Sequence, residues 1–343
     1  MTDMNRRSFL GGLAGAAAAA PAGPLRIAFL GASYSHARGK LDLIRQSDRW
    51  DLAGVWEPNA EVAAGLQAQG IRLLDRDRLL ADPSITVVAV EGDTNDNAPH
   101  ALLALEAGKH VHLEKPPART MAEFRALVAA AERRRLVLQV GYMWRYNPAI
   151  QAAIDAARNR WLGDVYLVRA TMNTLVAAEA RTAWARFRGG QMFEQGCHLT
   201  DMVVRTLGRP DRVTPILRKH GPHTDTLADN TLAVFEYPRA LALVTGATLQ
   251  TGAGPYRSFE IFGSNGVAVV RPLEPPELSI DLAEAAGPYR KGPQKPPVPE
   301  YRRFVDEFVA LAGAVTGVRP LPFSMALELD IQETFLRACE MPV

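Results

Sequence analysis

Short apolar runs alternate with segments of mixed polarity through the first half of the chain. The runs are the length of buried strands, and the segments between them are long enough for helices. The predicted strands are 25–30, 51–56, 85–90, 110–113 and 136–140, and the predicted helices are 37–46, 61–69, 98–107 and 121–135. One helix between successive strands indicates βαβ units and a parallel sheet, whose ligands bind at the carboxyl ends of the strands.

Local end signals support two of these helices and predict one more. Thr120 and Glu123 form a capping box in front of 121–135. Gly108 is a C-terminal glycine after 98–107. Asn147 followed by Pro148 is an N-cap with proline at the first helical position, which predicts a further helix over 148–158.

The second half of the chain has a different pattern, with strands in succession and few helices between them. The predicted strands are 165–173, 212–219, 231–237, 241–250, 257–262, 267–270 and 278–282, and the further helices are 191–207, 300–314 and 324–339. Gly263-Ser264-Asn265-Gly266 is a hairpin signal, and 287–299 is predicted to be a surface loop. The pattern indicates an open, mostly antiparallel sheet with helices on one face.

Composition fits this two-part α/β organisation. The chain has 343 residues, so at roughly 100–200 residues per domain two domains are expected. Lys and Arg number 39 and Asp and Glu number 37, a net charge of +2, which does not predict nucleic acid or an acidic membrane surface as a partner. Two cysteines, Cys197 and Cys339, are too few for a disulfide framework.

Residues 1–24 are predicted to be an export signal rather than part of the fold. Arg6 and Arg7 precede Ser8-Phe9-Leu10 and an alanine- and glycine-rich stretch, an arrangement that resembles the twin-arginine type. The stretch is too weakly apolar for a membrane span, so no membrane anchor is expected. A periplasmic or otherwise exported protein is predicted, and the alternative is a cytoplasmic protein with an alanine-rich tail.

The loop after the first strand is a candidate dinucleotide site. Gly31 fits the first glycine of such a loop, whereas Ser33 replaces the second glycine. Tyr34 and His36 complete the set of candidate cofactor contacts in this loop. Glu57 ends the second strand 26 residues after Gly31, where an acid binds the ribose hydroxyls, and this favours NAD over NADP.

Two longer motifs carry a family resemblance. Glu114-Lys115-Pro116 ends a predicted strand after Ala107-Gly108-Lys109, and Gly189-Gly190-Gln191-Met192-Phe193-Glu194-Gln195-Gly196-Cys197-His198-Leu199-Thr200-Asp201 follows about 80 residues later. Both resemble signatures of the Gfo/Idh/MocA oxidoreductases, and Gly141–Pro148 resembles the crossing between their domains. Glu194 stands where the family has aspartate, and Asn97 where many members have histidine.

The resemblance implies an N-terminal Rossmann dinucleotide-binding domain over 25–146 and a C-terminal α+β domain over 147–343. It further implies a nicotinamide cofactor, a sugar or polyol substrate, and a homo-oligomer formed through the second sheet. Within this frame Asn97, Glu114 and Pro116 are expected on the cofactor side of the site. Arg145, Tyr146, Trp184 and Asp201 are expected to contact the substrate.

Oxidation of a secondary alcohol needs a group that takes the hydroxyl proton. His198 is the best candidate, because the ordinary pKa of histidine is about 6.5. By resemblance, Lys115 is the cation that binds the reacting hydroxyl. Glu194 is four residues before His198, so it is expected to orient His198 or to hold another hydroxyl. Cys197 and His198 have no further ligands at zinc spacing, so no metal site is predicted.

Three functions are compatible with these residues. The first is an NAD-dependent oxidoreductase acting on a sugar or polyol. The second is a glycosidase of the same fold that oxidises the sugar transiently and then returns the hydride. The third is a non-catalytic dinucleotide- or sugar-binding protein, against which the presence of both Lys115 and His198 argues.

Overall fold

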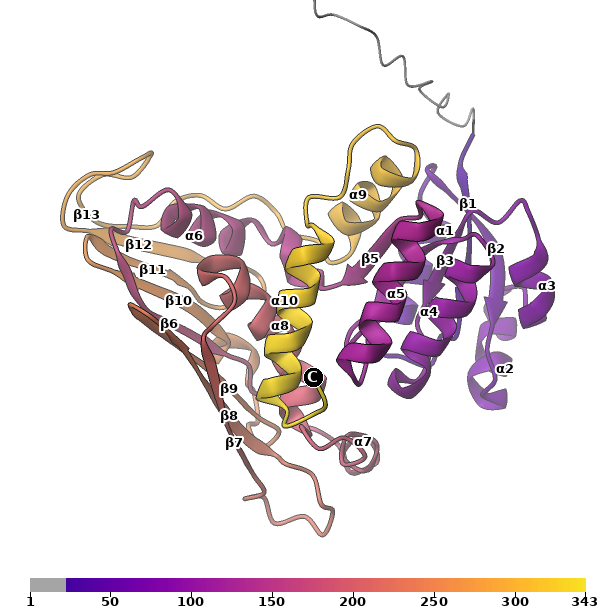
Figure 1. The fold of residues 1–343 in the computed structure, drawn as a ribbon, viewed down its shortest axis with the longest axis horizontal. Helices are drawn as coiled ribbons and strands as arrows, with labels where there is room; N and C mark the ends of the chain where they lie inside the picture. Colours follow the sequence, from indigo (N-terminus) through magenta and orange to yellow (C-terminus); the bar gives the residue numbers. More distant parts are fainter. Residues whose placement is uncertain (1–22) are drawn as a thin grey trace, which may run out of the picture.

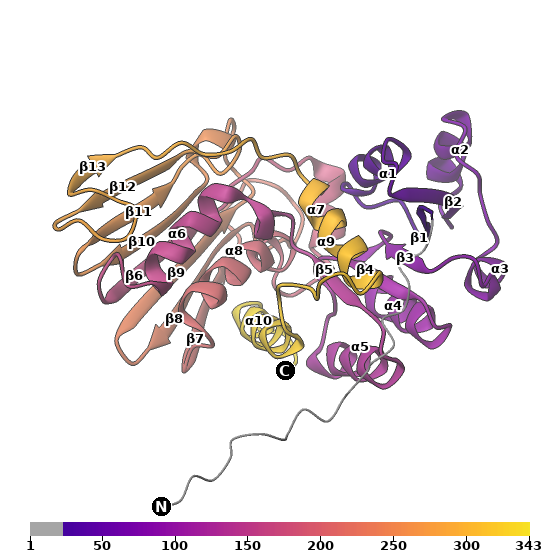
Figure 2. The ribbon, with the colours of Figure 1, turned by 90° about the horizontal axis from the view of Figure 1, so that it is seen from above.

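The computed structural model describes residues 23–343 and contains two sheets separated by helices (Figures 1 and 2). The export signal predicted over 1–24 therefore lies almost entirely outside the described residues. Across 23–343, no helix is both long enough and apolar enough to cross a membrane.

The first sheet has five parallel strands in the order β2-β1-β3-β4-β5, which confirms the predicted parallel sheet. Its strands are β1 (Leu25–Leu30), β2 (Trp50–Trp56), β3 (Val87–Val90), β4 (His110–Glu114) and β5 (Leu138–Gly141). The helices of this part are α1 (Ala37–Arg45), α2 (Ala60–Ala68), α3 (Arg76–Ala81), α4 (Asn97–Glu106) and α5 (Met121–Arg134). All four residues of β3 are buried, as expected for a parallel strand covered on both faces.

Local capping accounts for where two helices begin. At α5, the hydroxyl of Thr120 accepts the Glu123 backbone N–H at 3.1 Å, and the Glu123 carboxylate accepts the Thr120 backbone N–H at 3.2 Å. This is the predicted capping box. The short helix α3 was not predicted, and its start is marked only by Asp75, whose side chain accepts the Arg78 backbone N–H.

The second sheet has eight strands in the order β13-β12-β11-β10-β6-β9-β8-β7, and β6–β9 is its one parallel pair. Its strands are β6 (Val165–Thr171), β7 (Arg212–Arg218), β8 (Asn230–Tyr237), β9 (Ala240–Ala247), β10 (Ser258–Gly263), β11 (Gly266–Val270), β12 (Leu278–Leu282) and β13 (Gly292–Gln294). The helices are α6 (Pro148–Arg158), α7 (Ala178–Trp184), α8 (Gln191–Leu207), α9 (Val305–Val315) and α10 (Met325–Ala338). Helices α6, α8 and α10 lie against one face only (Figure 1). The mostly antiparallel sheet with one covered face is as predicted.

Two elements of this half were missed. Strand β13 falls within 287–299, which was predicted to be a loop; it has three residues, includes Pro293 and pairs only with β12. Helix α7 has seven residues and no side-chain cap, so the chain gives no local signal where it begins.

Helix α9 returns from the C-terminal part of the chain to the first sheet. The ring of Phe308 lies 4.8 Å from the His112 ring on β4 and 5.8 Å from the Trp50 ring on β2, measured between centroids. A Cβ atom at Gly39 on α1 would lie 3.0 Å from the Phe304 ring. One face of the parallel sheet is therefore completed by residues near 305.

A buried ammonium group lies under this helix. Lys40 has no exposed surface, and its Nζ donates to Glu91 Oε1 at 2.6 Å and to the Glu114 carboxylate. The Nε2 atom of His112 lies 2.9 Å from the same Nζ. Burial raises the pKa of Glu91. Burial also acts to raise the pKa of Glu114, but Lys40, His36 and Lys115 together outweigh it and hold that pKa well below its ordinary value. The pair Lys40–Glu114 fixes the end of β4, from which Lys115 follows.

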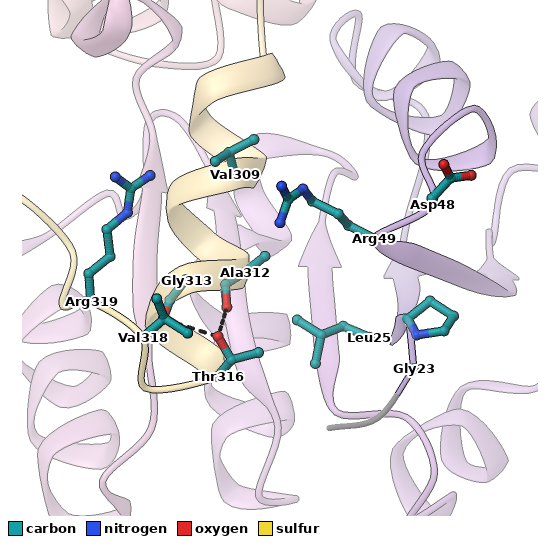
Figure 3. A pocket seen from close by; sticks show the side chains of 11 residues that line it. Gly23, Leu25, Asp48, Arg49, Val309, Ala312, Gly313, Thr316, Val318 and Arg319 are labelled. Carbon is teal, nitrogen blue, oxygen red and sulfur yellow. Dashed lines mark hydrogen bonds between the residues drawn. The ribbon is translucent and has the colours of Figure 1, made fainter. Parts of the chain in front are cut away.

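A cavity of about 550 Å³ lies beside the amino end of β1, away from the carboxyl ends of the parallel strands (Figure 3). Leu25 at the amino end of β1, Arg49 and the C-terminal half of α9 line it. Thr316 closes that helix by donating to the Ala312 carbonyl at 2.8 Å. Because ligands of parallel sheets bind at the carboxyl ends of the strands, this cavity is not the candidate site.

The buried carboxyl of Glu307 on α9 predicts a pH-dependent stability. Neither of its oxygens has a hydrogen-bond partner among residues 23–343, and burial raises the pKa of Glu307 from 4.5 to about 7 although Lys40 opposes the shift. A raised pKa means that folding favours the protonated form. The stabilisation is complete below the unfolded-state pKa and is lost as the pH rises through about 7.

We expect the free energy of unfolding to fall as the pH rises from about 4.5 to about 7, by up to ~1.4 kcal/mol per pH unit, and to level off above that. Glu307→Gln should remove most of this fall, and the exposed control Glu300→Gln should retain it. Urea unfolding at several pH values measures both. Parallel pH profiles for the wild type and Glu307→Gln would contradict the assignment.

Candidate active site

The carboxyl ends of β1 and β3 are followed by two glycines, Gly31 and Gly92, that lie in close contact. Gly31 has φ of +80°, and a Cβ atom there would lie 2.4 Å from the Cα of Gly92, so only glycine fits without displacement of the backbone. The first position of the predicted dinucleotide loop therefore has the conformation and close approach that such a loop requires. Ser33, in place of the second glycine, is exposed on the loop.

An opening of about 330 Å³ lies between this loop and the second domain. From the first domain it is lined by Ser33, Tyr34, Ser35, Gly92, Asp93 and Thr94, and from the second by Ala180, Ala183, Trp184, Arg186, Phe187 and Glu194. Arg186 donates to Asp93 Oδ2 at 2.9 Å, so one ion pair joins the two sides of the opening. Trp184, a predicted substrate contact, is among the residues that line the opening.

Lys115 and Glu194 meet across the domain boundary. The Nζ atom of Lys115 donates to the Glu194 backbone carbonyl at 2.7 Å and to its Oε1 at 3.1 Å. Only 2% of Lys115 and 5% of Glu194 is exposed. Burial alone would lower the pKa of Lys115, but the facing Glu194 carboxylate together with Cys197 and Glu114 outweighs it and raises the pKa. The ammonium therefore keeps its charge at the end of β4.

Tyr34 also contacts the Lys115–Glu194 ion pair. The sequence did not indicate this contact. The hydroxyl of Tyr34 donates to Glu194 Oε1, and the Lys115 ammonium lies 4.9 Å from the centroid of the Tyr34 ring. Burial, followed by the charge of Glu194, raises the pKa of Tyr34 well above its ordinary value. The loop position alone predicted a cofactor contact, because nothing in the sequence relates residue 34 to residue 194.

His198 lies one turn further along α8 in an aromatic enclosure. The centroid of its ring is 5.2 Å from that of Trp144, 6.1 Å from Tyr142 and 6.3 Å from His36. Its Nδ1 atom is buried without a hydrogen-bond partner in the described part of the chain. Burial, followed by the Lys115 charge, holds the pKa of His198 well below its ordinary value. The imidazole is therefore neutral near pH 7 and has a free nitrogen.

The expected orientation of His198 by Glu194 is not observed. Both residues lie on α8, but the hydrogen bonds of the Glu194 side chain go to Lys115 and Tyr34. The glutamate side chain is one methylene longer than aspartate, and it points across to the first domain rather than along its own helix. The second role predicted for Glu194, holding a hydroxyl, is compatible with its place at the opening.

The acid at the end of β2 contacts the glycine loop. Glu57 Oε2 accepts the Ala32 backbone N–H at 2.6 Å, and its Oε1 accepts the Asn59 backbone N–H at 2.8 Å. A negative charge thus lies directly beside the loop. The guanidinium of Arg76 lies 5.7 Å from the centroid of the Trp56 ring, and Trp56 directly precedes Glu57. The sequence did not indicate this contact.

Four residues predicted for the cofactor side contact one another beside Lys115. Asn97 Nδ2 donates to the backbone carbonyls of Glu114 at 3.2 Å and of Pro116 at 3.0 Å. His36 Nδ1 lies 3.1 Å from Glu114 Oε1. Asn97 Oδ1 remains buried without a partner in the described part of the chain.

Arg145 and Asp201, which were predicted substrate contacts, are bonded to protein groups instead. Arg145 Nε donates to Asp201 Oδ1 at 2.8 Å, and its Nη2 donates to Glu328 Oε2 at 2.8 Å. All three are buried, and none lines the opening. Arg145 instead links the domain crossing to α8 and α10. Tyr146 lines a separate cavity of about 590 Å³ near Pro148 and Asp306.

These groups fit a nicotinamide dinucleotide. The close approach of Gly31 and Gly92 leaves no side chain at this turn, and the Glu57 carboxylate lies beside the loop for a ribose. The buried Oδ1 of Asn97 is left for a donor that the described residues do not supply.

Comparison with known proteins covers both halves of the chain. Residues 25–142 match the family model of the Gfo/Idh/MocA oxidoreductase family, NAD-binding Rossmann fold, and residues 150–269 match the GFO/IDH/MocA C-terminal domain. Trans-1,2-dihydrobenzene-1,2-diol dehydrogenase of Bos taurus is 28% identical over 165 residues, 47% of this chain and 48% of that protein. The scyllo-inositol 2-dehydrogenase (NADP(+)) IolW of Bacillus subtilis is 24% identical over 211 residues, 61% and 55% of the two chains. The matched segment spans about half the length of these curated relatives.

Solved structures match over nearly the whole chain. UDP-N-acetylglucosamine 3-dehydrogenase GnnA from Acidithiobacillus ferrooxidans has a TM-score of 0.76 at 22% identity and covers 91% of this chain and 96% of its own. GenD2 from gentamicin A biosynthesis, in complex with NAD, has a TM-score of 0.76 at 22% identity and covers 98% and 96%. At this level of identity the likeness shows the fold.

Proposed function

We propose that this chain, which belongs to the Gfo/Idh/MocA oxidoreductase family, is a nicotinamide-dependent oxidoreductase acting on a secondary alcohol of a sugar or polyol. The observation that carries the proposal is the pairing of Lys115 with Glu194 at the carboxyl edge of the parallel sheet. The names of the matched relatives describe dehydrogenases of a diol and of an inositol, which supports a polyhydroxylated substrate.

The chemistry divides between the cofactor and the protein. When bound, the nicotinamide accepts or supplies the hydride. Lys115 has three N–H donors, of which two are used by Glu194, so the third is free for the reacting oxygen. A cation at that oxygen stabilises the alkoxide that develops as the proton leaves.

We propose that His198 is the base that accepts the proton of the reacting hydroxyl. Its depressed pKa keeps the imidazole neutral and able to accept a proton near pH 7, and its Nδ1 has no competing partner among the described residues. The aromatic enclosure of Tyr142 and Trp144 excludes water from the ring. Lys115 holds the hydroxyl, and His198 takes its proton.

Lys115→Ala and His198→Ala should each lower turnover by about 10²-fold or more while the protein still folds. The exposed control Lys219→Ala should leave turnover unchanged. Reduction of NAD in the presence of a polyol panel measures turnover, and urea unfolding checks the fold, since Lys115→Ala leaves Glu194 without its ion-pair partner. Full activity in either variant would remove that residue from the mechanism.

We also propose that NAD is preferred over NADP. The Glu57 carboxylate beside the loop binds ribose hydroxyls but repels a 2′-phosphate. Arg76 is the nearby cation that opposes this preference, although it is paired with Asp77 at 3.0 Å.

In calorimetric titrations of the apoprotein, NAD should bind at least about tenfold more tightly than NADP, a difference of ~1.4 kcal/mol. Glu57→Gln should narrow this ratio, and Glu61→Gln in the first turn of α2 should not. Equal affinities in the wild type would mean that Glu57 does not face the ribose.

We propose a second copy of this chain as the partner of the uncovered face of the second sheet. Among residues 23–343 no helix lies on this face (Figures 1 and 2). It carries polar side chains, among them the ion-paired Arg169 and Glu260, and a set of apolar side chains. The apolar side chains include Ile216, Leu232, Val234, Leu241, Leu243, Phe262 and Val267. Partly exposed apolar side chains gathered on one face are typical of an interface.

Light scattering should therefore give the mass of an oligomer. Leu243→Arg, at the centre of the face on β9, should shift the protein to monomers because it places an unpaired charge in the interface. Leu103→Arg on the exposed side of α4 is the matched control and should leave the mass unchanged. A monomeric wild type would contradict the proposal.

Export directed by residues 1–24 remains a proposal from the sequence. Fractionation of cells that express the chain with and without these residues tests it, and an equal distribution of both forms would contradict it.

A further inference from the structure

We propose that the cavity of about 590 Å³ beside the domain crossing binds a small organic cation, an ammonium group carried on an apolar body. This cavity is separate from the opening that is proposed to take the cofactor and the alcohol. Among the described residues, none lines both. The proposed binding is therefore independent of the oxidoreductase activity.

The walls of the cavity are largely apolar. Two alanines and four prolines line it beside the ring of Tyr146, and the prolines are Pro148, Pro299, Pro320 and Pro322. Small-molecule sites typically have volumes of about 300–1,000 Å³. The cavity is therefore large enough for a small organic molecule, and its walls suit an apolar body.

Tyr146 is the aromatic side chain of the cavity, and its neighbours hold it in place. Its ring packs edge-on against Phe323 with centroids 6.1 Å apart, and the Arg145 guanidinium lies 4.5 Å from the Phe323 centroid. Arg145 is in turn bonded to Asp201 and Glu328. The face of an aromatic ring attracts a cation. A preformed tyrosine wall therefore favours an ammonium group over a neutral group of similar size.

The charged side chains at the cavity also favour a cation. Asp155 on α6 and Asp306 on α9 line it, together with Arg319. Two carboxylates and one guanidinium leave a net charge of −1. Within residues 23–343, the ion pairs include none of these three side chains. Both carboxylates are therefore uncommitted, and only Arg319 opposes a bound cation.

Arg319 is shared between two cavities. A Cβ atom at Gly313 would lie 3.2 Å from its Cγ and 3.3 Å from its Nε, so its side chain runs along α9. Arg319 also lines the cavity beside the amino end of β1 (Figure 3). Its repulsion of a cation in the proposed site is therefore weaker than the attraction of the two carboxylates.

The test compares three probes that share a phenyl ring and differ in charge: benzyltrimethylammonium, benzyl alcohol and benzoate. Calorimetry measures the affinity of each for the full chain at constant ionic strength. The cation should bind about fivefold or more tightly than the other two, because it gains the tyrosine ring and the carboxylates. Saturation with NADH should leave its affinity unchanged, since the cavity and the opening are separate.

Two substitutions should change the affinity for benzyltrimethylammonium in opposite directions. Asp306→Asn removes an attractive charge and should weaken binding about two- to fivefold. Arg319→Gln removes a repulsive charge and should strengthen it. Both side chains are exposed, so neither change should affect the fold, and urea unfolding checks this. Asp281→Asn, exposed on β12, is the matched control and should leave the affinity unchanged.

Equal affinities for the three probes, or no binding of the cation, would overturn the inference. So would an unchanged affinity in both Asp306→Asn and Arg319→Gln, or changes of the same sign in the two variants. Competition between benzyltrimethylammonium and NADH would place the cation in the opening, and that result would also overturn it.

Discussion

An ammonium group that has lost all contact with water must be held by several partners, and Lys40 finds its partners at the ends of two neighbouring strands. Glu91 follows β3, and Glu114 ends β4. Removing Lys40 would leave the two buried carboxyl groups without their cation in an apolar layer, which is strongly destabilising. The constraint fixes where both strands end. Lys115 and the Gly92 turn begin at that point, so the position of the site depends on this group.

A second group of buried ion pairs fixes how the helices of the second domain lie against the crossing between the domains. Arg145 lies in the crossing between them, and its guanidinium is shared by Asp201 on α8 and Glu328 on α10. The helix that carries Asp201 also carries Glu194 and His198. The orientation of the second domain's reactive groups toward Lys115 is therefore set by an arginine that does not line the opening.

The elements were predictable where their signals are local. The Thr120–Glu123 capping box and the Asn147–Pro148 start are each contained in four residues or fewer, and the structure has both helices as expected. The site was predictable only as a set of residues. Which groups pair depends on contacts such as Tyr34 with Glu194, which are 160 residues apart. The same limit applies to Arg145, because a buried ion pair and a substrate contact look identical in a sequence.

Helix α9 has a consequence for how the chain folds during synthesis. The first five strands are complete by residue 141, yet the helix that places Phe308 on the rings of Trp50 and His112 lies beyond residue 304. A growing chain therefore presents an N-terminal layer with one face incomplete while the whole second sheet is being translated. Final closure of the nucleotide-binding half must wait until the residues of α9 have left the ribosome. Until then, transient contacts or chaperones must cover that face.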